Sequence, residues 1–385
     1  MQRLRISVPD QVLEDLKQRL VRTRWPGEVR ASGWDYGTNL GYLKELVEYW
    51  IGRYDWRAQE RELNRFDHYK AEVDGLGIHF IHQRAIGENP RPLMLIHGWP
   101  GSFYEFHQLI PLLTDPMGNS TEATDTFSVV VPSLPGYGFS DDPKVPGMNI
   151  SRIAEIFHKL MTQVLGYRRY GVQGGDWGAF VASQMGFAYP GNVIGVHLNC
   201  VALQSPDTDK SPHNEEARQA LAQLQRHYAN EAGYAEIQRT KPQTLAYALN
   251  DSPAGLAAWI VEKFRTWSDC DGNPERRFTK DQLLTNIMIY WLNAAIGSSM
   301  RLYYEELNHP FRLRSGERVE APTAVAVFPK EIATPPRSWA AQAYNLKRWT
   351  VMPRGGHFAA MEEPQLLADD IRAFYRDLGF ASKDR

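Results

Sequence analysis

Short apolar runs recur along most of the chain, and stretches with helical spacing separate them. The runs lie at residues 93–96, 128–131, 169–173, 193–198 and 324–328. Continuous apolar runs of this length suit strands that are buried on both faces, and their alternation with helices indicates parallel pairing. The pattern therefore predicts an α/β fold with a mainly parallel sheet.

Two stretches show the apolar stripe that is typical of helices covering such a sheet. One extends from residue 150 to residue 165, and the other lies near the C-terminus. Apolar residues that recur every three or four positions form one face of a helix, and that face packs on a core. We expect two covering helices here, with these apolar positions: Ile153, Ile156, Phe157, Leu160, Met161 and Val164 in the first, and Leu367, Ile371, Phe374 and Leu378 in the second.

The strand pattern disappears between residues 201 and 310. Helical patterns dominate this segment, as at residues 245–249 and 255–264. Because the strand pattern resumes afterwards, we expect a helical cap inserted into the sheet domain. The two parts of that domain would then be residues 91–200 and 311–385.

Residues 1–90 form a third region with its own pattern. It begins with an amphipathic helix that carries Leu13, Leu16 and Leu20, and a second helix follows around Leu46 and Trp50. Residues 66–73 and 78–83 are joined by a glycine-rich turn, which predicts a hairpin leading into the sheet. No repeat and no low-complexity linker interrupts the chain, so we expect the three regions to pack as one body.

Composition and charge argue against several classes of protein but do not identify a function. The chain has 385 residues, 43% of them apolar, and its net charge of −2 gives no argument for binding nucleic acid. Cys200 and Cys270 are its two cysteines, so we expect neither a disulfide framework nor a cysteine metal site. Charged residues at positions 10–17 interrupt any signal-like run, and no run approaches the ~20 apolar residues of a membrane span. We therefore expect a cytoplasmic enzyme.

The segment Gly174-Gly175-Asp176-Trp177-Gly178 joins the strand at residues 169–173 to a predicted helix. A nucleophile on a sharp turn between a strand and a helix needs small residues two positions before and after it, and glycines stand at both positions here. The nucleophile position holds Asp176 instead of the serine of an esterase. An aspartate there indicates chemistry that passes through an alkylated carboxylate.

A carboxylate nucleophile needs a base to release its ester, and His357 is the candidate. It stands in a glycine-rich loop after the strand-like residues 349–352, the position of the base in α/β hydrolases. A base needs an acidic partner, and Glu331 follows the preceding strand, where open α/β sheets build their sites. The chain order Asp176, Glu331, His357 is then nucleophile, acid, base. The rival acids are Glu305, Glu306, Glu320 and Asp369.

Oxyanion stabilisation would come from two backbone N–H groups. Residues 97–102 (HGWPGS) follow the strand at residues 93–96 directly, which makes the N–H of Trp99 one candidate. The residue after the nucleophile, Trp177, supplies the other.

At this point the chain resembles the microsomal type of epoxide hydrolase, a member of the α/β-hydrolase superfamily. The resemblance covers essentially the whole chain, including the helical N-terminal region. It is carried by five blocks in order: 97–102 (HGWPGS), 132–140 (PSLPGYGFS), 174–178 (GGDWG), 250–253 (NDSP) and 354–364 (RGGHFAAMEEP).

The resemblance implies a reaction in two steps that requires no cofactor and no metal. The aspartate opens an epoxide to form a hydroxyalkyl ester, and water activated by the His–Glu pair hydrolyses the ester to a vicinal diol. Two cap tyrosines would hydrogen-bond the epoxide oxygen and protonate the leaving alkoxide. They map onto Tyr234 and Tyr303, with Tyr304 and Tyr290 as rivals of Tyr303.

Three alternatives stay open at this stage. Haloalkane and haloacetate dehalogenases also use an aspartate nucleophile, and some follow it with tryptophan, but they need halide donors in place of the paired tyrosines. An esterase or lipase would need a serine at the position of Asp176. A binding protein that merely keeps the fold would usually have lost one member of the triad.

The expected partners are a small-molecule epoxide and water. The membrane-bound relatives carry an N-terminal hydrophobic anchor, whereas this chain starts at the first amphipathic helix, so we expect a soluble form. The N-terminal region would either wrap the core and cap or contribute to a homodimer. The sequence leaves the identity of the epoxide open.

Overall fold

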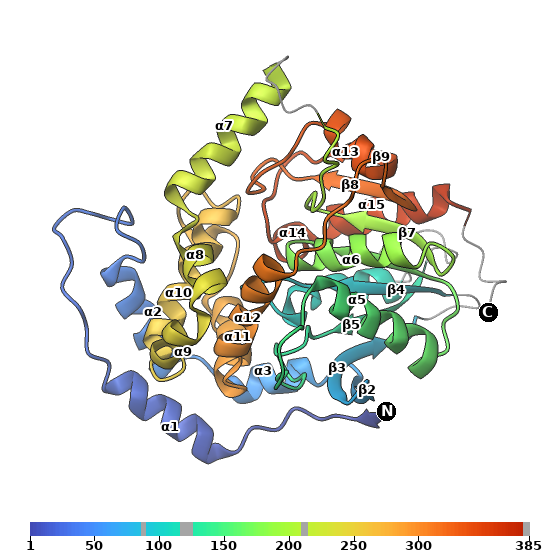
Figure 1. Ribbon diagram of the computed structural model, residues 1–385. Coiled ribbons are helices and arrows are strands. Elements are labelled where there is room, and N and C mark those ends of the chain that lie inside the picture. Colours follow the sequence, from blue (N-terminus) through green and yellow to red (C-terminus); the bar gives the residue numbers. More distant parts are fainter. Residues whose placement is uncertain (86–89, 116–125, 209–214, 380–385) are drawn as a thin grey trace.

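The computed structural model describes residues 1–85, 90–115, 126–208 and 215–379. Within these ranges a single sheet runs through the molecule, and helices cover it on both faces (Figure 1). In their order across the sheet the strands are β1 (Gln2–Arg3), β2 (His68–Val73), β3 (Leu76–Gln83), β5 (Phe127–Pro132), β4 (Arg91–Ile96), β6 (Tyr170–Gly174), β7 (Val193–Leu198), β8 (Val319–Val327) and β9 (Tyr344–Val351).

The sheet is antiparallel at its N-terminal edge and parallel elsewhere. Strands β1, β2, β3 and β5 pair antiparallel, whereas the pairs from β5 through β4, β6, β7 and β8 to β9 are parallel. This confirms the mainly parallel sheet. The predicted hairpin is also present, but its turn is only Asp74-Gly75, with φ of 51° and 80°. A two-residue turn with two positive φ values matches the strand twist, so β3 begins earlier than expected, at Leu76.

Two neighbouring residues of β7 show which helix covers each face of the sheet. Gly195 leaves room for Phe374 of α15 (Pro364–Asp377), whereas Val196 packs against Gly186 of α6 (Trp177–Ala188). Successive strand residues point to opposite faces, so α15 and α6 lie on opposite sides of the sheet. Helix α4 packs with α15, and α5 packs with α6. Their bounds are α4 (Leu109–Thr114) and α5 (Ile150–Lys159), the latter continued by a π-turn over Leu160–Val164.

Between β7 and β8 the described part of the chain is helical and contains no strand. These helices lie beside the sheet (Figure 1), and we propose that they are the cap expected from residues 201–310. Their bounds are α7 (Glu215–Asn230), α8 (Gly233–Thr240), α9 (Pro242–Leu249), α10 (Pro253–Trp267), α11 (Lys280–Leu292) and α12 (Ala295–Asn308), with a 3-10 turn at Pro274–Arg276.

The N-terminal region bridges these cap helices and the sheet. Its strands extend the sheet, while α1 (Asp10–Val21) and α2 (Leu40–Gly52) pack on α10 and α11. The Tyr49 hydroxyl donates to Asp281 of α11 at 2.8 Å, and Arg19 pairs with Asp251 at 2.8 Å. A third helix, α3 (Trp56–Leu63), leads into β2. The apolar faces of these helices are therefore covered within the chain itself.

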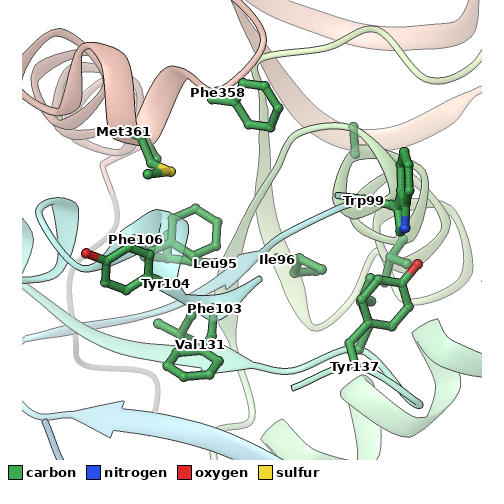
Figure 2. Close-up of a cluster of buried hydrophobic side chains, with 14 of the residues drawn as sticks. Leu95, Ile96, Trp99, Phe103, Tyr104, Phe106, Val131, Tyr137, Phe358 and Met361 are labelled. Atoms are coloured by element: carbon green, nitrogen blue, oxygen red, sulfur yellow. The ribbon is translucent and has the colours of Figure 1, made fainter. Parts of the chain in front are cut away.

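A buried cluster at the centre of the molecule supports the carboxyl end of β4. Figure 2 shows Ile96 of β4 and Trp99 of the loop that follows it, together with Phe106 and Phe358 from two other segments. The remaining helical elements are η1 (Phe103–Phe106), α13 (Arg337–Ala343) and α14 (Ala359–Glu362). The loops that carry the expected site residues begin on this packed base.

Candidate active site

Asp176 stands at the sharp turn between β6 and α6, with φ of 49° and ψ of −130°. A side-chain-bearing residue rarely adopts this backbone, which is a sign of strain held by the surrounding structure. The flanking glycines allow it. A Cβ on Gly174 would lie 2.2 Å from the carbonyl oxygen of Gly178, and one on Gly178 would lie 1.9 Å from that of Ile96. The expected spacing of small residues therefore has a direct steric cause.

The structure brings Glu331 and His357 to Asp176. Nδ1 of His357 lies 2.7 Å from Oε1 of Glu331, and Nε2 lies 3.5 Å from Oδ2 of Asp176. A bridge between Lys330 and Gly356 holds the two loops together just before these residues. The side chains of His357 and Glu331 are 4% and 3% exposed. A carboxylate on Nδ1 fixes the tautomer that directs Nε2 at the nucleophile.

Three of the four rival acids have other partners. Glu320 pairs with Arg318, Asp369 pairs with Arg372, and Glu306 accepts the N–H of Phe311. Glu331 is the carboxylate that His357 contacts through Nδ1.

The charge on His357 depends on both carboxylates. Burial alone would lower the pKa of His357, but the neighbouring charges of Glu331 and Asp176 outweigh it and hold this pKa well above its usual value. These charges favour the protonated imidazole in the resting site, where it faces the Asp176 carboxylate.

The backbone N–H of Trp99 donates to Oδ1 of Asp176 at 2.8 Å. The N–H of Trp177, at the start of α6, has no acceptor among the described residues. One oxygen of Asp176 is thus held by the loop after β4, while the other faces His357. Of the two expected backbone donors, the N–H of Trp99 therefore contacts the carboxylate directly.

Tyr234 and Tyr303 lie together on the cap side of the site. Their rings are 5.9 Å apart, Tyr234 stacks on Trp99 at 5.2 Å, and Tyr303 meets Trp177 edge-on at 4.8 Å. The two phenols lie close enough for each to affect the pKa of the other. Burial and the nearby charge of Asp176 both raise the pKa of each phenol, which places both hydroxyls within electrostatic reach of the carboxylate.

The rival tyrosines lie elsewhere. Tyr304 is 44% exposed, and the hydroxyl of Tyr290 donates to the carbonyl oxygen of Gly101 at 2.6 Å. Neither phenol takes part in the Tyr234–Tyr303 contact.

Comparison with known proteins identifies the family. Residues 1–106 match the model of the epoxide hydrolase N terminus, and residues 91–364 match that of the alpha/beta hydrolase fold. The chain is 47% identical to a protein of Stigmatella aurantiaca named provisionally as an epoxide hydrolase, over 97% of this chain and 84% of that protein. It is 42% identical to epoxide hydrolase 1 of Oryctolagus cuniculus, over 96% and 87% of the two chains. The chain belongs to the epoxide hydrolase family.

A solved structure extends the similarity to three dimensions. The crystal structure of juvenile hormone epoxide hydrolase from Bombyx mori superposes with a TM-score of 0.89 at 35% identity, covering 98% of this chain and 94% of that one. The α/β-hydrolase fold and the epoxide hydrolase activity expected from the sequence are confirmed. The dehalogenase alternative gains no support from these relatives.

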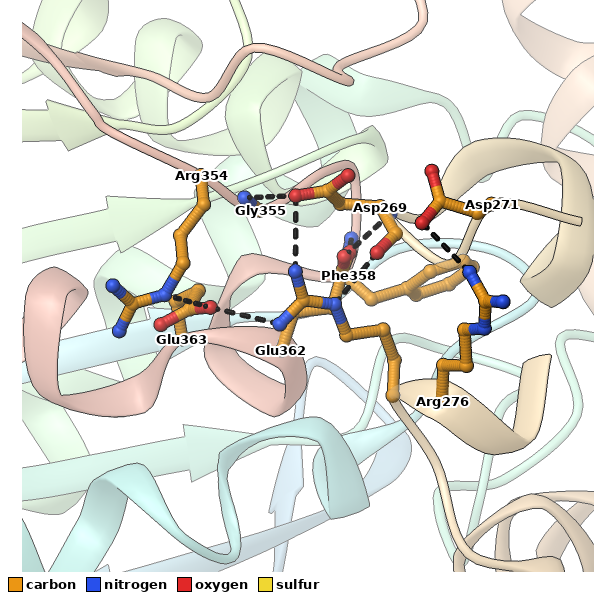
Figure 3. A network of polar contacts seen from close by, with 9 residues as sticks. Asp269, Asp271, Arg276, Arg354, Gly355, Phe358, Glu362 and Glu363 are labelled. Carbon is orange, nitrogen blue, oxygen red and sulfur yellow. Dashed lines mark hydrogen bonds and ion pairs between the residues drawn. The ribbon is translucent and has the colours of Figure 1, made fainter. Parts of the chain in front are cut away.

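In this epoxide hydrolase an ionic network joins the cap to the loop that carries His357 (Figure 3). We call Asp269, Arg277, Arg354, Glu362 and Glu363 the cap–base network. Arg277 pairs with Asp269 and with Glu363, both at 3.0 Å, and Arg354 pairs with Glu363 at 2.7 Å. Glu362 accepts the N–H of Asp269 at 2.8 Å, and burial raises the pKa of Glu362 to about 7.

The backbone of the catalytic loop is held by the same network and by the cap. Asp269 accepts the N–H of Gly355 at 3.0 Å, and Glu362 accepts that of Phe358 at 3.0 Å. The N–H of His357 itself donates to the carbonyl oxygen of Trp267, the last residue of α10, at 2.9 Å. The loop that carries His357 is thus anchored from the cap side.

Sequence reasoning missed Trp267 and Lys263, which help to shape the site. The Trp267 ring lies 5.2 Å from both Tyr234 and His357, and Nζ of Lys263 lies 4.7 Å from the Tyr234 ring centre. Both residues occupy an ordinary helical pattern of α10, so nothing local distinguishes them from packing residues. Only the fold brings that helix face over the nucleophile.

Proposed function

We propose that the enzyme converts an epoxide and water to a vicinal diol through an ester on Asp176. Oδ2 of Asp176 attacks an epoxide carbon, the carbon–oxygen bond of the ring breaks, and a phenol of the Tyr234–Tyr303 pair gives its proton to the alkoxide. The observation that carries this proposal is the packing of the two tyrosine rings, 5.9 Å apart, against Trp99 and Trp177 beside the carboxylate. An acid donor opposite the nucleophile lowers the barrier for a poor leaving group.

The second step regenerates the enzyme. Water gives one proton to Nε2 of His357 and adds to Cγ of Asp176, and the N–H groups of Trp99 and Trp177 stabilise the oxyanion on Oδ1. The ester bond then breaks, and the leaving alkoxide takes the proton from His357. The carboxylic acid left on Asp176 gives its proton to His357, so that the products are the diol and the resting enzyme, with Asp176 ionised and His357 protonated.

Alkylation itself prepares the base for this step. An ester on Asp176 removes one of the two negative charges that hold the proton on His357. The pKa of His357 therefore falls in the intermediate, and the imidazolium gives its proton to the tyrosinate formed in the first step. The neutral imidazole can then accept a proton from water.

We propose that the rest of the substrate occupies the space beside the tyrosines. A cleft of about 550 Å³ is lined by Trp177 and Tyr303 together with Phe180, Leu203 and Phe311. Cavities of this size hold small organic molecules of many kinds. A panel of aryl, aliphatic and terpenoid epoxides, with haloalkanes beside them, tests reaction class and substrate class together.

Single turnover in heavy-oxygen water tests the ester mechanism. The solvent oxygen that attacks Cγ remains in the carboxylate, so mass analysis of the peptide containing Asp176 should find the label there. A turnover that leaves this carboxylate unlabelled would eliminate the covalent route.

Among the described residues no helix is both long and apolar enough to cross a membrane. We propose a cytoplasmic location, which the two unpaired cysteines, Cys200 and Cys270, support.

A homodimer also remains a proposal, although the N-terminal helices contact the cap of their own chain. Light scattering distinguishes the monomer mass of 44.0 kDa from twice that value.

A further inference from the structure

A small cavity adjoins the nucleophile within the described structure. It offers about 10 Å³, close to the room that one water molecule requires. Four side chains give it a polar lining: Asp176, His357, Glu105 and Asn199. The rest of its wall comes from the backbone of two glycine-containing loops and from apolar residues, among them Phe106 and Phe358. Figure 2 shows both of these rings in the buried cluster.

Glu105 is the acidic member of this lining to which the mechanism gives no role. It stands on η1, and its carboxylate lies directly over Gly101, since a Cβ on that glycine would be 1.5 Å from Oε1 of Glu105. A Cβ on Gly98 would in turn be 2.2 Å from Oδ1 of Asp176. The two glycines of the HGWPG loop therefore each leave room for a carboxylate, and both carboxylates border the cavity.

The surroundings of Glu105 favour the neutral carboxyl group. Burial and the charge of Asp176 raise the pKa of Glu105 to about 8, although the charge of His357 and a hydrogen bond from the backbone of Gly98 oppose the rise. A buried carboxyl group costs stability unless it is hydrogen-bonded. In either protonation state it presents an acceptor oxygen to a neighbour in the cavity.

Asn199, at the end of β7, completes the polar lining. Its Oδ1 accepts from Gln173 at 2.8 Å, which turns the amide nitrogen Nδ2 away from that contact. A Cβ on Gly175 would lie 2.5 Å from this nitrogen, so Nδ2 packs against the loop that carries Asp176. No described residue accepts a hydrogen bond from Nδ2. The cavity thus has a donor in Asn199, a base in His357 and an acceptor in Glu105.

We propose that Glu105 is a positioning residue for the hydrolytic water: its carboxyl oxygen accepts one hydrogen bond from a water molecule in this cavity while His357 takes the other proton. The inference rests on the proposed ester mechanism and adds a residue to its second step. With both hydrogens engaged and Asn199 donating to it, the water presents a lone pair to Cγ of Asp176. Such preorientation matters for ester hydrolysis and has no part in the opening of the epoxide.

Two substitutions separate this role from a structural one. Glu105→Met keeps the length of the side chain and removes the acceptor, whereas Glu105→Gln keeps an acceptor oxygen. Each variant is mixed with the fastest epoxide of the panel under single-turnover conditions. Tryptophan fluorescence follows alkylation, since three indoles surround the site, and intact mass of quenched samples counts the enzyme that carries the ester.

We expect Glu105→Met to slow ester hydrolysis by about 10- to 100-fold and to accumulate alkylated enzyme, with alkylation itself changed less than about threefold. Glu105→Gln should restore hydrolysis to within about fivefold of the wild-type rate. As a control for lost stability we choose Glu60→Met, which removes the half-buried acceptor of the Val8 N–H far from the site. It should leave both rate constants within about twofold of wild type.

Three results would overturn the role of Glu105: hydrolysis by Glu105→Met at the wild-type rate, equal slowing of both steps, or failure of Glu105→Gln to restore hydrolysis. The wild-type enzyme tests the mechanism on which the inference rests. If wild-type enzyme forms no ester, the proposed function fails. If it forms the ester and Glu105→Met releases it normally, only the inference about Glu105 fails.

Discussion

At the scale of single residues, the charge of Asp176 links the two steps of the proposed reaction. While the carboxylate is free, it contributes to the raised pKa of His357 and to the raised pKa of both phenols. Alkylation removes that charge, so it should lower the pKa of His357 and of both phenols at once. The role of each group can therefore be tested by measuring the rate of ester formation and the rate of ester hydrolysis separately.

Replacement of His357 by alanine should block the second step. We expect ester formation to persist and hydrolysis to fall by about 10²- to 10⁴-fold, because no other described side chain contacts Oδ2 of Asp176 as a base. Intact mass spectrometry would then find the enzyme trapped as its ester. Rapid release of diol by this variant would remove His357 from its role.

The tyrosines should act on the first step. Tyr234→Phe with Tyr303→Phe should slow alkylation by at least about 10²-fold and change ester hydrolysis much less, since the phenols serve the leaving alkoxide. Stopped-flow fluorescence measures the first step directly. Tyr304→Phe, at an exposed neighbouring position, is the matched control and should behave as wild type. Equal slowing of both steps would argue against proton donation by the pair.

The pH dependence of ester hydrolysis should reveal how the charge of Asp176 affects the pKa of His357. His357 accepts a proton only when neutral, so ester hydrolysis should fall as the pH drops below the pKa of His357 in the intermediate. That pKa should be lower than the pKa of His357 in the free enzyme, where the Asp176 charge raises it. NMR titration of the free enzyme and single-turnover rates measure the two values. Identical values would contradict the charge coupling.

At the scale of elements, the cap–base network ties the end of α10 to the loop that carries His357 (Figure 3). Its acidic members are mostly buried, with Asp269 at 16% and Glu363 at 8% exposure. An ion pair of this kind is costly to break from one side, because the partner is left buried and unpaired. The network should therefore affect both the stability of the fold and the placement of the base.

Arg277→Met should reveal this double effect. We expect the free energy of unfolding to fall by about 1–3 kcal/mol, and ester hydrolysis to slow more than alkylation. Arg276→Met is the matched control, because its partner Asp271 is 72% exposed and the pair should contribute less than about 1 kcal/mol. Urea unfolding with single-turnover kinetics measures both quantities. Equal behaviour of the two variants would show that the network is dispensable.

At the scale of the whole molecule, the N-terminal region holds the cap and the sheet in one body. Its strands continue the sheet, and Leu46 of α2 is fully buried in the common core. Leu46→Ala should lower the free energy of unfolding by about 2–5 kcal/mol and increase hydrogen exchange in α10 and α11, which α2 contacts. Val21→Ala, at a 66% exposed position, should change stability by less than about 0.5 kcal/mol. Unchanged exchange in the cap would contradict the bridging role.

The sequence predicted those parts of the fold and site that depend on local patterns. Buried parallel strands are continuous apolar runs, and the spacing of Gly174 and Gly178 around Asp176 follows from a close approach of backbones. Tyr234 and Tyr303 came from the family resemblance alone. Trp267 and Glu105 were missed because their roles arise from contacts between distant segments. For Glu105 the signal was Gly101, whose missing side chain leaves the room that the carboxylate fills.

The hydrogen bond from the N–H of His357 to the carbonyl oxygen of Trp267 has a consequence for engineering. Exchanging the cap between relatives is an obvious route to new substrates, since the cap supplies Tyr234, Tyr303 and much of the wall of the cleft. A graft that replaces the end of α10 would also replace the backbone acceptor that holds the base. Grafts that keep residues 267–277 of this chain should retain turnover, and those that exchange them should lose it even when both tyrosines are present.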